Sequence, residues 1–262
     1  MQGQEKLSTL LKSYSLVELY HTILLLGDYG CGKHTLVKEL ASHYNIELID
    51  ITENISLDYI NEIYLRAVPT MYLIDTTLIN EKKQNVLLKM LEEPSKYAYI
   101  VLIGENKSSL INTILNRCVI FEFENYSKDF LKTFISDKTN EDFILKVCNT
   151  PGQIKLFNSK SLKELDELCQ KIVDKISVAN FYNTMTISKK FNYKDEFDKF
   201  DIRAFFNILL NKLFTLYINN NEIYYLNLYN IVNKYKSAMK DTRLNKEYLI
   251  ESMLIELWKC RG

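Results

Sequence analysis

The stretch "TILLLGDYGCGKHTL", Thr22 to Leu36, decides the fold class of this chain. An apolar run leads into a glycine-rich turn that matches the pattern G-x-x-x-x-G-K, and an amphipathic stretch follows. In a strand–turn–helix unit of this kind, backbone N–H groups converge on phosphate oxygens, and the helix N-terminus adds a partial positive charge. The motif therefore predicts a phosphate-binding loop, with Gly27, Gly30 and Gly32 in the turn and Lys33 able to reach the β and γ phosphates.

Further strands and helices are expected after this loop, within the first 124 residues. Short runs rich in aliphatic and aromatic residues predict the strands "IELIDI", "TMYLID", "YAYIVLIG" and "VIFEFE". Helical patterns at 34–44, 57–67, 80–92 and 108–115 separate the strands. Strands joined by helical crossovers form a mostly parallel sheet that is covered on both faces. The sequence therefore predicts an α/β fold.

The second half of the chain carries helical patterns in place of strands. Beyond Asn125 the apolar residues recur at spacings of three and four, which is typical of amphipathic helices. A polar segment at 188–201 is expected to be a loop or a weak helix. We expect three domains: an α/β nucleotide-binding-like domain over 1–124, a small helical domain over 125–174 and a second helical domain over 175–262.

Composition narrows the function classes. The 33 basic and 33 acidic residues cancel, so a protein that grips DNA by bulk electrostatics is not expected, and any nucleic-acid contact is local or shared with partners. The five cysteines form no C-x-x-C pair, so neither a metal centre nor a disulfide framework is predicted. No apolar run approaches the ~20 residues of a membrane span, and the first residues lack a secretory pattern. A cytoplasmic location without membrane contact is expected.

The residues that would hydrolyse a nucleotide are incomplete. A P-loop ATPase holds Mg²⁺ through a hydroxyl directly after the lysine and through an Asp at the end of a later strand. Here His34 occupies the hydroxyl position, and Thr35 comes one place too late. Asp75 ends a predicted strand, but Thr76 follows where such ATPases usually have Glu. The predicted nucleotide-binding residues are Gly27, Gly30, Gly32, Lys33, Thr35 and Asp75. They predict a loop that holds ATP or ADP with weak or no Mg²⁺ coordination and with negligible hydrolysis.

A second stretch, "NVLLKMLEEPSKYAYIVLIGENKSSLINTILNRC", Asn85 to Cys118, resembles a known family. It is similar to the AAA+ ATPase-like subunits of bacterial DNA polymerase III clamp loaders, whose hallmark reads roughly N-A-L-L-K-x-L-E-E-P and then L-x-x-T-I-x-S-R-C. The resemblance extends to "NTPGQIKLF", which looks like the glycine turn of the family's second nucleotide-sensing segment. It implies a P-loop parallel sheet with a helical lid, followed by an all-α collar domain that mediates oligomerisation.

Within this family the chain looks most like the delta-prime type. The altered positions at His34 and Thr76 point that way, as does the ending "RLNKEYLIESMLIELWK", while no counterpart of gamma/tau's long C-terminal extension follows. Two features depart from the family pattern. No cysteine lies between Lys33 and Asp75, so the usual zinc-binding insertion is missing and no zinc is expected. The first sensor position falls near Gly104 and Glu105, where a Thr or Asn is usual.

The resemblance also implies partners and a role for one arginine. Arg117 matches the arginine of the S-R-C motif, with Asn116 in place of Ser, and looks like an arginine finger offered in trans to ATP on a neighbouring subunit. The implied partners are gamma/tau-like and delta-like subunits in a hetero-pentamer, with the sliding clamp and primed DNA reached through the complex. The chain would then be a non-motor subunit.

Several alternatives stay open at this point. The chain could be an active gamma-type ATPase of the clamp loader, or another AAA+ ATPase that acts on DNA. Arg117 could be an ordinary surface arginine. Glu92 and Glu93, at the predicted end of a helix before Pro94, are interpreted either as a solvated helix end or as a contact with a neighbouring subunit.

Overall fold

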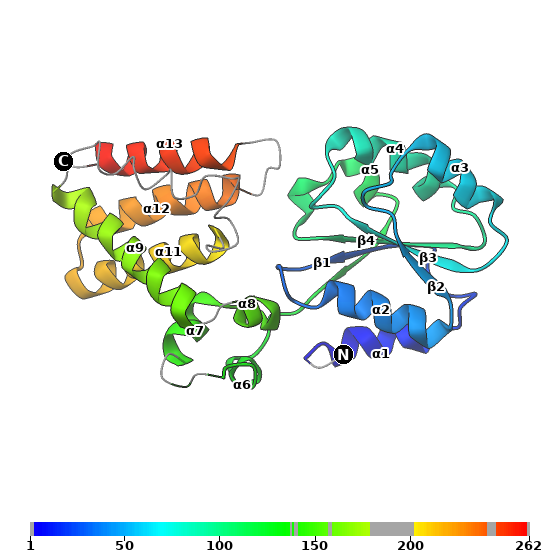
Figure 1. Cartoon of the computed structure of the whole chain (residues 1–262), viewed down its shortest axis with the longest axis horizontal. Helices are drawn as coiled ribbons and strands as arrows, with labels where there is room; N and C mark the ends of the chain where they lie inside the picture. Colours follow the sequence, from blue (N-terminus) through cyan, green and yellow to red (C-terminus); the bar gives the residue numbers. More distant parts are fainter. Residues whose placement is uncertain are drawn as a thin grey trace. The chain divides into compact units, whose positions relative to one another are not determined.

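The computed structural model describes residues 3–136, 138, 141–156, 159–178, 202–239 and 245–260. The chain divides into two compact units, and each is treated by itself below (Figure 1). The first comprises residues 1–130 and 150–152, and the second comprises 131–149 and 153–262. The expected division into three domains stays a prediction, and the segment at 188–201 lies outside the described residues.

The first unit contains a five-stranded sheet in the order β2-β3-β4-β1-β5. All neighbouring strands pair in parallel, which confirms the predicted α/β fold. Each strand lies within a stretch that the sequence predicts as extended: β1 (Thr22–Leu26), β2 (Glu47–Asp50), β3 (Thr70–Asp75), β4 (Ala98–Gly104) and β5 (Val119–Glu122). Because the strands are parallel, their carboxyl ends meet at one edge of the sheet and their amino ends at the other.

Helices cover both faces of this sheet (Figure 1). On one face lie α1 (Glu5–Ser13) and α2 (Lys33–Tyr44), and on the other α3 (Leu57–Leu65), α4 (Glu81–Glu92) and α5 (Asn112–Leu115). Successive strand residues point to opposite faces, so Ile23 and Leu25 pack with α1 and α2, whereas Leu24 and Leu26 pack with the other three helices. This burial on both faces explains why the sequences of β1, β3 and β4 are almost continuously apolar.

Two local features differ from the sequence-based expectation. The helix α1 is not among the predicted elements, although its Leu11 is fully buried. The single helix predicted at 108–115 is wrong in extent, because a 3₁₀ turn, η1 (Lys107–Ser109), and the short α5 replace it. Buried Gln84 explains the break: its side chain donates to Ser109 O (3.1 Å) and accepts from Ile111 N (3.0 Å), and so takes backbone groups that a continuous helix would use.

The regular elements of the second unit, within its described residues, are all helices. Its elements are α7 (Glu141–Val147), α9 (Ser159–Val178), α11 (Ile202–Asn220), α12 (Ile223–Ala238) and α13 (Lys246–Lys259). Two short helices, α6 (Lys128–Lys132) and α8 (Pro151–Leu156), include residues of both units. The central helix α11 packs against α7, α9 and α12. Its Phe205, Leu209 and Leu213 recur every four residues and are fully buried. No helix in the described ranges has the length and apolarity needed to cross a membrane.

The carboxyl ends of β3 and β4 are packed closely. Thr76, directly after β3, is 2% exposed, and both its backbone N and its Oγ1 donate to Ile103 O at 2.9 Å. A Cβ added to Gly104, the last residue of β4, would lie 2.8 Å from Thr76 Oγ1 and 3.2 Å from Leu26 Cδ2. Glycine is therefore required at position 104 for lack of space.

We predict that Gly104→Ala lowers the free energy of unfolding of the first unit by about 1–3 kcal/mol, because the added methyl overpacks this corner. In the double variant Gly104→Ala/Thr76→Ala, part of this loss should be absent, since the colliding hydroxyl is gone. Amide hydrogen exchange of β4 measures the effect; Trp258, the only tryptophan, lies on α13 and reports on the second unit. If the double variant loses as much stability as the two single variants added together, the overpacking explanation is wrong.

Candidate functional site

The phosphate loop lies between β1 and α2, at the carboxyl edge of the sheet. Gly30 and Gly32 have φ angles of 76° and 101°, in the left-handed region that side chains other than glycine rarely adopt. Gly32 is also the N-cap of α2, so the loop ends at a helix N-terminus. Gly27 N donates to Gly104 O at 3.1 Å, which extends the sheet by one bond into the loop. The backbone therefore has the form that the motif predicts.

Lys33 is turned onto its own loop. The residue is 8% exposed, and its Nζ donates to Gly27 O and, at 3.0 Å, to Asp28 O. Cys31 Sγ lies 3.8 Å from the same nitrogen. Burial raises the pKa of the Cys31 thiol above its usual value, although the nearby ammonium opposes the shift. A phosphate that approaches Lys33 competes with these carbonyl oxygens for the N–H groups of the ammonium.

Three consecutive carbonyl groups of the loop are held by other segments of the first unit. Tyr29 O accepts from Thr150 Oγ1 (2.7 Å), Gly30 O from Gly152 N (2.9 Å) and Cys31 O from the Tyr126 hydroxyl (2.6 Å). A Cβ on Gly152 would overlap Gly30 Cα, so glycine is needed there for this close approach. Burial is the main cause that raises the pKa of Tyr126 to about 12, which keeps its hydroxyl a donor. The "TPG" segment thus packs directly on the phosphate loop.

The residues at the positions that hold magnesium in P-loop ATPases are either exposed or bonded within the chain. His34 and Thr35 lie exposed on the first turn of α2. Asp75 Oδ1 accepts from both N and Oγ1 of Thr77, at 2.9 and 2.7 Å. The described residues contain no group of three or more His, Cys, Asp or Glu side chains that could hold a metal ion. Directly after Lys33 the chain has the imidazole of His34 in place of the hydroxyl that helps to hold Mg²⁺ in P-loop ATPases, and the Asp75 carboxylate is bonded to Thr77.

The position of the hydrolytic glutamate is also occupied differently. Thr76 points into the corner between β3 and β4, where its hydroxyl is bonded to Ile103 O and faces Gly104. At the expected sensor position, near Gly104 and Glu105, the last residue of β4 is a glycine without a side chain. The hydroxyl proton of Thr76 is used by Ile103 O, and a longer acidic side chain at position 76 would meet a closely packed, buried corner.

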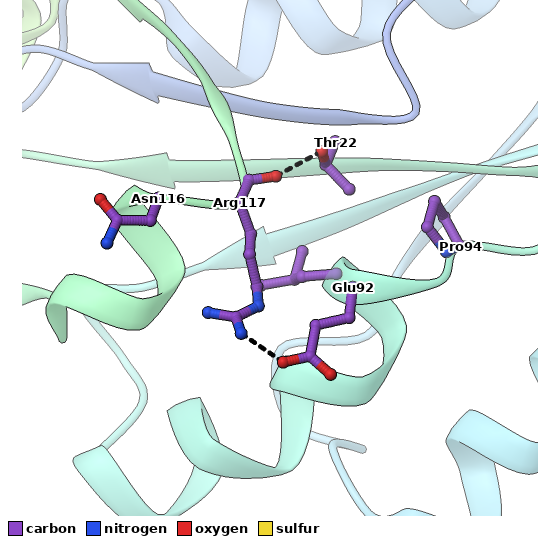
Figure 2. A pocket seen from close by; sticks show the side chains of 6 residues that line it. Thr22, Glu92, Pro94, Asn116 and Arg117 are labelled. Atoms are coloured by element: carbon purple, nitrogen blue, oxygen red, sulfur yellow. Dashed lines mark hydrogen bonds and ion pairs between the residues drawn. The ribbon is translucent and has the colours of Figure 1, made fainter.

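Arg117 lies at the opposite edge of the sheet, between α5 and β5. Its backbone is fixed because Arg117 O accepts from Thr22 Oγ1 at 2.7 Å (Figure 2). Its side chain is 29% exposed, with Nη1 donating to Thr113 O at 2.7 Å and Nη2 donating to Glu92 Oε1. The side chains of Arg117 and Glu92 border a hollow of about 670 Å³, which is lined by Thr22, Leu91, Glu92, Pro94, Asn116 and Arg117.

The structure therefore separates the predicted site residues into two groups. The loop residues follow Leu26, the last residue of β1, whereas Arg117 faces Thr22, the first residue of that strand. At a rise of roughly 3.3 Å per residue, the strand alone separates them by about 13 Å. Arg117 does not join its own phosphate loop.

Sequence reasoning missed four contacts of these sites. Thr22 and Glu92 hold Arg117, while Tyr126 and Thr150 hold the phosphate loop. Within the chain, the Glu92 carboxylate pairs with Arg117. The sequence shows a pair of glutamates before Pro94, but no local spacing indicates that Glu92 contacts Arg117, 25 positions later.

Comparisons with known proteins agree with this arrangement. A family model described as "DNA polymerase III, delta subunit" matches residues 60–127. ATPase WRNIP1 of Dictyostelium discoideum is 33% identical over 128 residues, which are 44% of this chain and 14% of that protein. DNA polymerase III subunit gamma of Buchnera aphidicola is 26% identical over 51% of this chain and 46% of its own length. For subunit tau of Escherichia coli the identity is also 26%, over 54% of this chain and 28% of that protein.

The chain thus spans less than half the length of each of these relatives. The residues that the family model matches begin in α3 and end after β5. They include α4 and β4, and they contain Arg117. Together with the gamma and tau relatives and the parallel P-loop sheet, this match shows that the chain is similar to AAA+ clamp-loader subunits of DNA polymerase III.

Proposed function

We propose that this chain is a delta-prime-type, non-motor subunit of a sliding-clamp loader and that Arg117 acts in trans on ATP held by a neighbouring subunit. The observation that carries the proposal is the place of Arg117 at the sheet edge opposite its own phosphate loop. Since the side chain is already held at that edge, a nucleotide that it contacts has to belong to another chain.

The chemistry of arginine suits this role. A guanidinium stays charged and can bind phosphate oxygens through two parallel hydrogen bonds. An arginine finger stabilises the charge that develops during phosphoryl transfer and accelerates it by about 10³–10⁵-fold. The hollow beside Arg117 leaves space for the phosphate end of a nucleotide that a neighbour would present.

The chain's own phosphate loop supports a non-motor role. Thr76 is bonded within the sheet, Asp75 is bonded to Thr77, and Lys33 is bonded to its own loop. We propose that ATP or ADP, if held, binds through the loop amides after Lys33 leaves Gly27 O and Asp28 O, with weak or no Mg²⁺ coordination and without zinc.

The proposed assembly follows from the family. Gamma- or tau-like and delta-like subunits would complete a hetero-pentamer, which reaches a sliding clamp and primed DNA in the cytoplasm. The helical residues 125–174 would form the lid, and 175–262 the collar through which the subunits assemble. A gamma-type motor is the second candidate, because the DNA polymerase III relatives are gamma and tau subunits.

The first test is ATP turnover by the purified chain, measured as phosphate release with Mg²⁺ present. We expect negligible turnover, because the metal and the attacking water are not positioned. Thr76→Glu should not restore it, since the hydroxyl position after Lys33 is still His34. A steady rate of about 1 s⁻¹, typical of slow phosphoryl-transfer enzymes, that disappears in Lys33→Ala would favour the motor instead.

The second test replaces Arg117 by Ala in a reconstituted loader with wild-type motor subunits. The adjacent ATP site should lose about 10³-fold or more in turnover, and clamp loading should fall with it. Folding should change by no more than about 1 kcal/mol, the usual contribution of a partly exposed ion pair. Arg66→Ala is the matched control, because Arg66 forms a comparable pair with Glu47 on the same unit. Wild-type loading by the Arg117→Ala complex would exclude the finger.

A further inference from the structure

We infer that Glu92 is a positioning residue for Arg117, which it holds in the orientation that meets a neighbour's phosphate. The inference rests on the function proposed above. It begins from the contact in Figure 2, where the guanidinium of Arg117 points to the carboxylate of Glu92, the last residue of α4.

Three contacts from three segments restrain Arg117. Thr22, at the start of β1, fixes its backbone carbonyl; Thr113 O, on α5, accepts from Nη1; and Glu92, on α4, accepts from Nη2. Glu92 supplies the only side-chain contact to the guanidinium among those described, and the only one that carries charge. Removal of Glu92 would therefore leave Nη1 as a single pivot about which the group can rotate.

The contacts with Thr113 O and Glu92 leave N–H groups of Arg117 that can bind a ligand. A guanidinium has five N–H groups, and the described contacts use one on Nη1 and one on Nη2. Three N–H groups remain, which are enough for a two-point contact with phosphate oxygens. Glu92 can therefore stay bound while Arg117 engages a phosphate, so the carboxylate acts as a support and need not leave.

The place of Glu92 in the fold is unfavourable for a carboxylate by itself. It lies in the last turn of α4, where the helix dipole disfavours negative charge, and it is followed directly by exposed Glu93. The pair with Arg117 offsets this repulsion. Lys89 and Lys96 do not replace it, because their ammonium groups lie over the rings of Tyr64 and Tyr97 at 5.6 and 4.8 Å.

Preorganisation is the benefit for catalysis. A free arginine side chain loses about 2 kcal/mol of rotamer entropy when it is fixed. Glu92 and Thr113 fix the guanidinium before the neighbour's nucleotide arrives. The rotamer entropy is therefore lost in advance and does not raise the free energy of the transition state. The expected signature is a lower kcat without Glu92, at little change in KM for ATP.

The experiment compares Glu92→Ala, Glu92→Gln and the control Glu93→Ala in the reconstituted loader. Glu92→Ala should lower ATP turnover at the adjacent site by about 10²-fold at saturating ATP, the cost of a misplaced catalytic group. Glu92→Gln keeps an oxygen acceptor for Nη2 and should retain most of the turnover. Glu93→Ala removes the neighbouring exposed carboxylate and should behave as wild type.

A second readout uses the isolated full-length chain. The rate at which phenylglyoxal modifies Arg117, followed by mass spectrometry, should rise several-fold in Glu92→Ala, less in Glu92→Gln and not in Glu93→Ala. Arg66, paired with Glu47 at 2.6 Å, is the internal reference. Loss of the ion pair raises this reactivity even if the pair has only a structural role, whereas a lower kcat at constant KM is expected only if Glu92 positions Arg117 for catalysis.

The outcomes separate the two proposals. If Arg117→Ala abolishes turnover but Glu92→Ala does not lower it, the positioning role is overturned and the finger stands. An increase in turnover in Glu92→Ala would also overturn the positioning role, since Glu92 would then hold Arg117 away from the neighbour's phosphate. If Arg117→Ala itself leaves turnover unchanged, the proposed function fails and the role of Glu92 fails with it.

Discussion

Parallel strand pairing is the constraint on which the two sites depend. Each strand of the sheet runs in the same direction, so the loop after β1 and Arg117, two residues before β5, are placed at opposite edges of one sheet. The register pairs Leu26 with Glu122, which fixes this separation to the residue. A sheet that is buried on both faces resists a shift of register, because a slip by one residue would turn its apolar side chains to the wrong face.

At the carboxyl edge the polar groups of the phosphate loop are satisfied by the protein itself. Lys33 bonds to carbonyl oxygens of its own loop, and the next three carbonyls accept from Thr150, Gly152 and Tyr126. Because buried polar groups are costly when unpaired, each of these bonds stabilises the loop in its present form. A ligand at this loop has to compete with them.

At the amino edge the balance is different. Arg117 and Glu92 are partly exposed, so their attraction adds little to the stability of the fold. Its importance lies in orientation, because the carboxylate and Thr113 O together define where the guanidinium points. A weak pair can therefore serve a function that requires a charge to be held in place beside an open hollow.

The sequence by itself determined the α/β class, the strand positions and the phosphate loop, because apolar periodicity and glycine placement act over a few residues. It also located Arg117 through its motif. Only the tertiary structure decided what these residues contact: Glu92 lies 25 positions from Arg117, and Thr150 lies 121 positions from Tyr29. The break between η1 and α5 was hidden for the same reason, since buried Gln84 on α4 causes it. Periodicity specifies which face of an element is buried, whereas such pairings arise only when the sheet brings distant segments together.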